Sequence, residues 1–305
     1  MLTLAQAGAQ RIGSTCAHVF VDERHARHAY APPEDGPPSK FIIFTRGRSG
    51  STLLVDLLKR HPAIRCHHEA LSSAAVYADM PMWTKGSRDA NRSGFLDSLY
   101  TQGVPERQMQ AVGFKAFPQQ LTRSEFIGLG TSPHVKKIVL RRSNLLDVYV
   151  SEIKARKLGE YKSVNTSSLR VHVFLTDFRA FVRNVEREYG CIDSLRDGSW
   201  LGLSYDEIAS AERRRGTMQR VFEHLGVMNL ADADEAALDW DEATSSTYSP
   251  AKMAVLGGKQ MDGRAGRSST LMKQDVAPHS SSIDNFAQLV KVFKGTRFES
   301  MLRGA

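Results

Sequence analysis

The sequence predicts an α/β protein with a P-loop-like, three-layer fold, in which helices flank a central parallel β-sheet. Two observations carry this prediction. A short apolar run, residues 41–44, leads directly into a loop rich in Gly, Ser and Arg and then into a helical pattern. Further short apolar runs alternate with helical patterns, which is typical of a parallel sheet covered on both faces. A chain of 305 residues, of which 41% are hydrophobic, can bury such a core.

The apolar runs predict strands at residues 41–44, 111–115, 136–142 and 200–205. A helix begins at Ser51, because the following leucines fall on one helical face, and it ends before Pro62. Further helices are predicted at residues 143–159, 167–190, 217–226 and 282–293. The acidic stretch 231–242 is expected on the surface, and residues 251–279 are expected to form a long loop.

The chain is predicted to consist of an N-terminal arm or linker, residues 1–38, and one folded domain, residues 39–305. Residues 30–40 contain four prolines, which suit an extended linker. The sequence has no apolar run long enough to span a membrane and no start of the signal-peptide kind. Cys16, Cys66 and Cys191 are widely spaced and form no CxxC motif, which argues against a disulfide framework or a zinc knuckle. We therefore expect a cytoplasmic protein.

The loop TRGRSGSTLL, residues 45–54, has the features of an anion site at a helix N-terminus. Gly47 and Gly50 permit close approach of the backbone, and Arg48 adds a positive charge with a bidentate fork. Ser51 and Thr52 add hydroxyl donors. The alternative is an ordinary turn between a strand and a helix, with a serine as N-cap.

This loop differs from the loop of nucleotide-hydrolysing proteins. Ser51 stands where a lysine should follow Gly50, and Thr45 stands where the first glycine should be. The strand 136–142 ends in arginines, whereas such proteins end a neighbouring strand in a metal-binding Asp. The sequence therefore predicts an anion that is bound without a metal ion.

A second phosphate site is expected where the strand 136–142 ends. Arg141 and Arg142 lie at its carboxyl end, the edge at which open α/β sheets bind ligands, and Ser151 lies on the next predicted helix. One of the arginines together with Ser151 can hold a phosphate. The alternative places both arginines on a solvated rim. The formal net charge of +8 suits a polyanionic partner, whether nucleic acid, a membrane surface or a multiply phosphorylated small molecule.

Together, RGRSGSTLL and LRRSNLLDVYVS resemble the two phosphate motifs of sulfotransferases that use 3′-phosphoadenosine 5′-phosphosulfate (PAPS), in their bacterial carbohydrate and small-molecule form. The segments GFK, FEHLGV, LMKQ and FKGTRFESML add to the resemblance, which covers most of the chain from Phe41 onward. It implies transfer of a sulfuryl group from PAPS, as co-substrate, to an oxygen or nitrogen of a carbohydrate or other small-molecule acceptor. The residues that it implies for PAPS binding are Gly47, Arg48, Ser49, Gly50, Ser51, Thr52, Arg141, Arg142, Ser151 and Lys273. Arg142 is preferred to Arg141 because Asn144 follows it in an R-x-N context.

The resemblance also implies a general base in the segment CHHEAL. We expect Glu69 in this role, with His68 and His67 as alternatives, and Arg48 as the group that stabilises the leaving phosphate. Glu69 could instead be a surface or salt-bridged carboxylate. Lys115, at the end of a predicted strand, is expected either to contact the sulfonate or acceptor or to form a structural salt bridge. Cys66, His67, His68 and Glu69 could also bind a metal ion. Adjacent ligands without a distant partner motif make a weak metal site, however, so no metal ligand is assigned.

Two further hypotheses remain. The chain could be a divergent P-loop small-molecule kinase, which would depend on ATP and magnesium. It could also be a non-enzymatic, basic nucleic-acid-binding protein, whose binding would fall steeply with salt. Its positive charges gather at predicted strand ends rather than in a known nucleic-acid-reading motif, so we expect no nucleic-acid partner.

Overall fold

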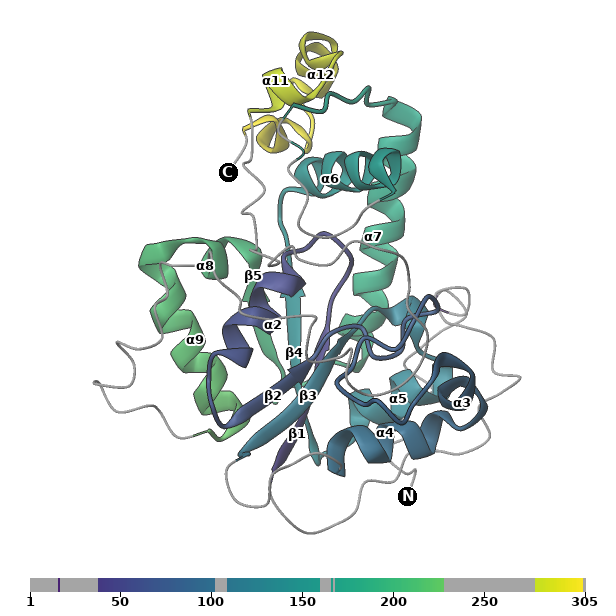
Figure 1. Cartoon of the computed structure of the whole chain (residues 1–305). Helices are drawn as coiled ribbons and strands as arrows, with labels where there is room; N and C mark the ends of the chain where they lie inside the picture. The colour runs from purple at the N-terminus through teal and green to yellow at the C-terminus, as the bar shows by residue number, and fades with distance from the viewer. Residues whose placement is uncertain are drawn as a thin grey trace. The chain divides into compact units, whose positions relative to one another are not determined.

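The computed structural model describes Cys16 and residues 38–101, 109–159, 166, 168–227 and 278–303. The chain divides into two compact units, one of residues 1–143 and 180–238 and the other of residues 144–179 and 239–305 (Figure 1). We call them the sheet unit and the helical unit and describe each by itself. The predicted division into an arm, 1–38, and one domain, 39–305, stays a prediction.

The sheet unit is built on five parallel strands in the order β2-β3-β1-β4-β5. Their bounds are β1 Ser39–Phe44, β2 Ile64–His67, β3 Ala111–Ala116, β4 Val135–Arg141 and β5 Leu201–Ser204. In register, Phe44 at the end of β1 lies opposite Ala116 of β3 and Val139 of β4. The carboxyl ends of the strands therefore meet at one edge of the sheet.

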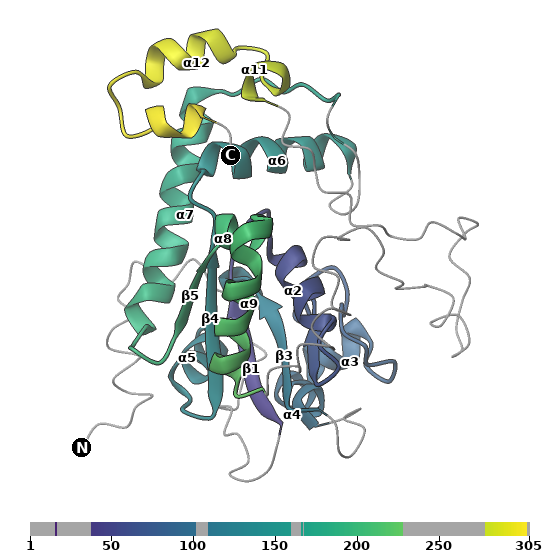
Figure 2. The ribbon, with the colours of Figure 1, turned by 90° about the vertical axis from the view of Figure 1, so that its left-hand side faces the viewer.

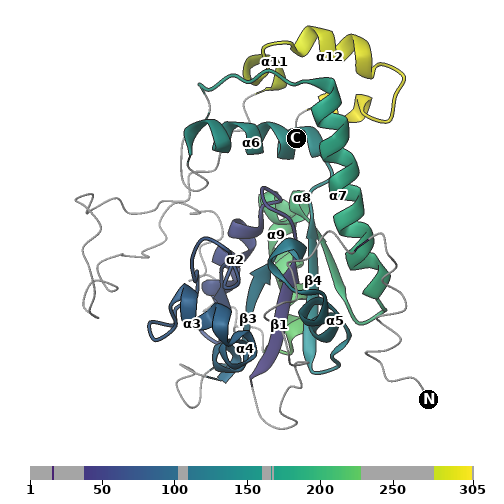
Figure 3. The same ribbon diagram turned by 90° about the vertical axis from the view of Figure 1, so that its right-hand side faces the viewer.

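Helices cover both faces of this sheet (Figures 1, 2 and 3). One face carries α2 Ser51–Lys59, α8 Tyr205–Ala209 and α9 Ala211–Leu225; the other carries α4 Arg92–Thr101, α5 Arg123–Thr131 and residues 180–195 of α7 Leu175–Leu195. The short α3 Lys85–Ala90 and η3 Pro118–Gln120 complete the unit. The predicted three-layer fold with a central parallel sheet is confirmed.

The strand order places a switch point between β1 and β4. The connection that leaves β1 leads toward β2, whereas the connection that leaves β4 leads toward β5 on the opposite side. Open α/β sheets bind ligands in the crevice at such a point, outside the carboxyl ends of the strands. The two predicted phosphate motifs follow these same two strands.

The core of the sheet unit is apolar and aromatic. Residues 41–44 of β1 are fully buried. Phe44 stacks on Trp200 with ring centroids 5.3 Å apart and meets Phe126 of α5 edge-on at 5.4 Å. A side chain of this size stabilises the folded state by about 1.5–3 kcal/mol when fully buried. Because this packing lies directly below the loop after β1, the loop begins from a rigid base.

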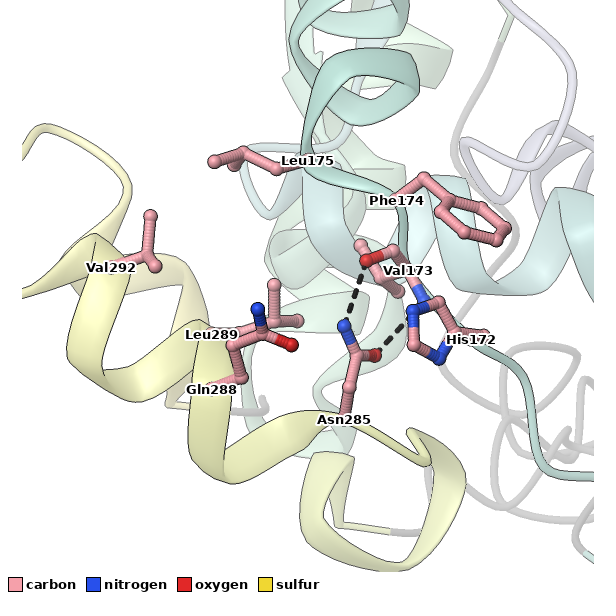
Figure 4. A pocket seen from close by; sticks show the side chains of 8 residues that line it. All are labelled: His172, Val173, Phe174, Leu175, Asn285, Gln288, Leu289 and Val292. Atoms are coloured by element: carbon pink, nitrogen blue, oxygen red, sulfur yellow. Dashed lines mark hydrogen bonds between the residues drawn. The ribbon is translucent and has the colours of Figure 1, made fainter.

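The helical unit comprises α6 Leu145–Leu158, the first turn of α7, α11 His279–Ser282, α12 Phe286–Phe293 and η5 Glu299–Leu302. Phe178 packs against the rings of Tyr149, Phe293 and Phe298. A buried hydrogen bond joins His279 Nε2 to the Asp147 carboxylate oxygen Oδ1 at 2.5 Å. A small pocket lies beside α12, lined by His172, Val173, Phe174, Leu175, Asn285, Gln288, Leu289 and Val292 (Figure 4).

Several elements differ from the sequence predictions. Helix α7 begins at Leu175 rather than at residue 167, because the chain before it is extended and Val171 pairs with Ser282 and Asp284 through its backbone. The side-chain amide of Asn285 likewise bonds the backbone N–H and carbonyl of Val173 at 3.0 and 2.9 Å (Figure 4). Helix α9 begins earlier than predicted, at Ala211, because Ser210 caps it. Strand β2, not predicted, pairs with β3 at the edge of the sheet.

The expectation of no disulfide is wrong, because Cys16 and Cys191 form one, with Cα atoms 5.8 Å apart. Widely spaced cysteines give no local signal for a contact between residues 175 positions apart. Cys66 is free and buried. The predicted surface segment 231–242 and loop 251–279 lie outside the described residues, apart from the last two positions of the loop. None of the helices described here is long and apolar enough to cross a membrane.

Candidate functional site

The loop after β1 has a left-handed backbone at two positions. Arg48 has φ 65° and Gly50 has φ 83°. An L-residue in this region costs roughly 1–2 kcal/mol, so the fold holds Arg48 against a local preference. Where right- and left-handed residues alternate in a loop, successive N–H groups point to one side and form a concavity for anions. Arg48 and Gly50 are the left-handed positions of this loop, and its anion-binding role stays a prediction.

Helix α2 begins with Ser51, and its N-cap is Gly50, which has no side chain to cap the first N–H groups. The serine N-cap of the alternative interpretation is therefore wrong, and the anion-binding role of the turn stays a prediction. No acidic residue lies in the first turn, so the positive end of the helix dipole is not neutralised there. The helix offers N–H groups and the hydroxyls of Ser51 and Thr52 at this end.

Lys115 of β3 brings a cation to this helix end. Its ammonium donates to Ser51 Oγ at 3.3 Å and to Thr52 Oγ1 at 3.2 Å, and it lies 3.2 Å from Glu69 Oε1. The side chain of Lys115 is only 2% exposed. Of the two expectations for Lys115, the structure shows the salt bridge. The sequence-based comparison with P-loops missed this contact, because the lysine comes from the neighbouring strand and not from the loop.

Glu69 reaches the loop because β2 ends two residues before it, at the same edge of the sheet as β1 and β3. Besides its ion pair with Lys115, it accepts a hydrogen bond from Gln120 Nε2 through Oε2 at 3.2 Å. Its side chain is 22% exposed, so solvent or a ligand can reach the carboxylate. The structure thus brings Glu69, Lys115 and the first turn of α2 together.

The two histidines of CHHEAL lie in different surroundings. His67 is buried and accepts the backbone N–H of Asp79 through Nδ1 at 3.2 Å. Burial lowers the pKa of His67 to about 4, and the charges of Arg65 and Lys59 act in the same direction. His68 lies with Nε2 3.8 Å from a carboxylate oxygen of Asp56 on α2. His67 is therefore a neutral, structural histidine at physiological pH, and the role of His68 as a base stays a prediction.

At the end of β4, the two arginines contact different parts of the sheet unit. Arg141 forms an ion pair with Asp193 of α7 and stacks over the ring of Tyr189 at 4.6 Å. Arg142 stacks over the ring of Tyr205, at the start of α8, at 4.4 Å. A cation over an aromatic face within 6 Å is attracted by the ring quadrupole. Both guanidinium groups are therefore oriented by aromatic rings.

Tyr205 also explains why position 50 is glycine. A Cβ atom at Gly50 would lie 2.1 Å from Cδ2 of Tyr205, so only glycine fits beside this ring. The Tyr205 ring thus contacts both the loop after β1 and Arg142. The sequence predicted Gly50 for close approach to an anion and missed this second requirement, because the contact joins residues far apart in the chain.

Two predicted ligands are not placed with these residues. Ser151 lies on α6 in the helical unit, so its pairing with Arg141 or Arg142 stays a prediction. Lys273 lies outside the described residues. Asn144, which supported the choice of Arg142, caps α6 through hydrogen bonds from the backbone N–H groups of Leu146 and Asp147 at 3.1 and 3.3 Å.

Arg46 was not predicted from the sequence as part of the site. It donates to Glu188 of α7 at 2.5 Å, and its guanidinium lies 4.7 Å from the centre of the Phe181 ring. The only sequence signal for it is its place two residues before Arg48 in the same basic loop. Within the described part of the chain, no group of three or more His, Cys, Asp or Glu residues could hold a metal ion. Burial raises the pKa of Cys66 to about 12, so this residue is a neutral thiol.

Two of the solved structures that resemble the chain are described here, and both likenesses are loose. No family model and no curated protein sequence matches the chain. Mouse sulfotransferase SULT7A1 complexed with PAP is 12% identical and aligns over 88% of each chain with a TM-score of 0.45. A sulfotransferase from Alicyclobacillus acidocaldarius is 16% identical and aligns over 67% of this chain and 90% of its own, with a TM-score of 0.36. At these TM-scores neither likeness carries an argument about what this chain does.

Proposed function

We propose that the chain is a sulfotransferase that moves the sulfuryl group of PAPS to a hydroxyl of a carbohydrate or other small-molecule acceptor, without a metal ion. The observation that carries the proposal is the contact of Lys115 with Glu69, Ser51 and Thr52. It joins a cation, a carboxylate and the N-terminal hydroxyls of a helix at the end of an anion-binding loop. Sulfuryl transfer requires a proton acceptor and positive charge at one place.

In this proposal the loop after β1 binds the 5′-phosphosulfate. Lys115 donates to the oxygens of Ser51 and Thr52, so the hydroxyl hydrogens of these residues remain for a bound anion. Arg48 and the N–H groups at the start of α2 add positive charge. These groups stabilise the negative charge that builds on the phosphate oxygen as its bond to sulfur breaks.

Glu69 is the proposed general base. The acceptor oxygen forms a bond to sulfur, the bond between sulfur and the 5′-phosphate oxygen breaks, and the acceptor proton goes to the Glu69 carboxylate. The hydrogen bond from Gln120 and the ion pair with Lys115 fix the orientation of this carboxylate. His68 is the alternative base.

The end of β4 is the proposed site of the 3′-phosphate. Arg141 and Arg142 lie at the switch point of the sheet beside the loop, which is where a ligand with two phosphates can reach both motifs. Ser151 and Lys273 complete this site in the proposal.

Calorimetry tests the nucleotide. We expect 3′-phosphoadenosine 5′-phosphate to bind in a buffer that contains EDTA, and ATP with magnesium to bind more weakly. The reverse preference would support the kinase hypothesis, and failure of both nucleotides together with salt-sensitive RNA or DNA binding would support the nucleic-acid hypothesis. Incubation with labelled PAPS and a panel of sugars, phenols and amines then identifies the acceptor.

A further inference from the structure

We propose that Tyr189 of α7 is a positioning residue that fixes the loop after β1 relative to the end of β4. The inference deepens the proposed function and rests on it, because that function assigns one phosphate of the ligand to each of these two segments. Tyr189 itself touches no ligand in this proposal. It acts through Ser49 and through the backbone that precedes Arg141.

The Tyr189 hydroxyl lies between the two segments. It donates a hydrogen bond to the carbonyl oxygen of Leu140 at 2.9 Å. Since its hydrogen is engaged there, the contact of 3.5 Å with Ser49 Oγ has Ser49 as the donor. A chain of two hydrogen bonds thus runs from the loop through the phenol to the next-to-last residue of β4. Thr45 Oγ1 donates to the same Leu140 carbonyl at 3.1 Å.

The ring of Tyr189 supports the same arrangement. The guanidinium of Arg141 lies over it at 4.6 Å and also pairs with Asp193, one helical turn further along α7. The residue before Tyr189, Glu188, pairs with Arg46 of the loop. Tyr189 and Asp193 are four positions apart on one helix, so their side chains share a face, whereas Glu188 lies about 100° around the helix from Tyr189. This part of α7 therefore contacts a residue from each phosphate motif.

The tyrosine is well suited to a fixed role. Tyr189 is 8% exposed, and burial raises its pKa, so the phenol stays a neutral donor at physiological pH. Removal of its hydroxyl leaves the Leu140 carbonyl with the hydrogen bond from Thr45. Ser49 is buried and loses its contact with Tyr189. We therefore expect the loop, and not the strand, to respond more strongly to this change.

The test compares Tyr189→Phe with Tyr100→Phe. Tyr100 is a matched control, because it is also buried and donates to a carbonyl of a central strand, that of Phe41 at 3.3 Å, at the start of β1. We expect similar losses of thermal stability from the two variants. Only Tyr189→Phe should weaken binding of 3′-phosphoadenosine 5′-phosphate, by about tenfold, while Tyr100→Phe stays within about twofold. Tyr189→Leu, which also removes the ring beneath Arg141, should weaken it further.

Hydrogen exchange of the ligand-free protein separates this inference from the proposed function. Tyr189→Phe should speed exchange in residues 45–52, and Tyr100→Phe should not. If the wild type binds no nucleotide but the loop still exchanges faster in Tyr189→Phe, the proposed function fails and the positioning role holds. If the two variants match in both exchange and affinity, the positioning role is overturned. Should Tyr189→Phe fail to fold, Ser49→Ala removes the same contact, and it should speed loop exchange in the same way.

Discussion

The ammonium of Lys115 on β3 lies 3.2 Å from a carboxylate oxygen of Glu69, which follows β2. The same ammonium bonds two hydroxyls in the first turn of α2. A loop that lacks the usual lysine after Gly50 therefore receives one from the neighbouring strand. Because all five strands are parallel, their carboxyl ends bring residues that are far apart in the sequence to one edge.

The first prediction concerns Lys115→Met, which keeps the apolar stem and removes the charge. We expect kcat to fall by about 10²–10³, since positive charge next to the reacting group stabilises the transition state. Steady-state kinetics with PAPS measures this. Lys136→Met, which removes an exposed lysine from β4, is the control and should have little effect. Equal kcat values for the two variants would contradict a role of Lys115 in the reaction.

Glu69→Gln should separate binding from turnover. Glutamine keeps one side-chain oxygen, which can still accept from Lys115, but it loses the second acceptor that Gln120 uses and cannot take the acceptor proton. We expect turnover to fall by about 10²–10⁴, the usual contribution of a general base, with nucleotide affinity within about threefold of wild type. Glu223→Gln on the exposed side of α9 is the control. Full activity of Glu69→Gln would transfer the role of base to His68.

The sequence alone was sufficient to predict where the loop after β1 lies and which strands surround it. β1 and the start of α2 were predicted to within two residues, because the fully buried run 41–44 and the following glycines and hydroxyls are adjacent in the chain. The strands β3, which carries Lys115, and β4, which leads into the two arginines, were predicted for the same reason. β3 is buried throughout, and residues 137–140 of β4 are buried.

The contacts that orient these residues were not predictable in this way. β2 has only four residues, two of them charged or polar, so its alternation is too short to predict a strand. Without β2 the sequence gives no reason for Glu69 to meet Lys115. The contacts of Tyr205 with Gly50 and of Glu188 with Arg46 join residues more than 140 positions apart, and such pairs leave no local pattern.

Gly50→Ala should disturb the loop for two reasons. The residue has φ 83°, and its new Cβ would lie 2.1 Å from the Tyr205 ring. We expect a loss of about 2 kcal/mol or more in the free energy of unfolding and weaker nucleotide binding. Gly128→Ala in α5 has open space around it and should stabilise the protein by about 0.5–1 kcal/mol. Urea denaturation measures both, and adding Tyr205→Ala to Gly50→Ala should recover the steric part.

The Cys16–Cys191 disulfide should stabilise the folded protein, because it closes a long loop and so restricts the unfolded chain. It joins residues 175 positions apart. We expect reduction by dithiothreitol to lower the free energy of unfolding by about 2–4 kcal/mol. Cys16→Ser should lose a similar amount and should no longer respond to the reductant. A wild-type protein whose denaturation midpoint is the same with and without reductant would show that this disulfide adds no stability.

The last prediction is an acid sensitivity that comes from His67. The pKa of His67 is about 4 in the folded protein, whereas the ordinary value of 6.5 applies in the unfolded chain. Between these two pH values the unfolded chain binds a proton that the folded chain does not. The free energy of unfolding must then fall as the pH drops through this window, by about 3 kcal/mol in total. His67→Asn keeps an oxygen that can accept the backbone N–H of Asp79 and does not titrate. Its loss of stability between pH 7 and pH 5 should be smaller than that of the wild type by about 2 kcal/mol. His134→Asn, at an exposed position before β4, serves as the control. An equal loss of stability in the wild type and in His67→Asn would mean that His67 does not cause the acid sensitivity.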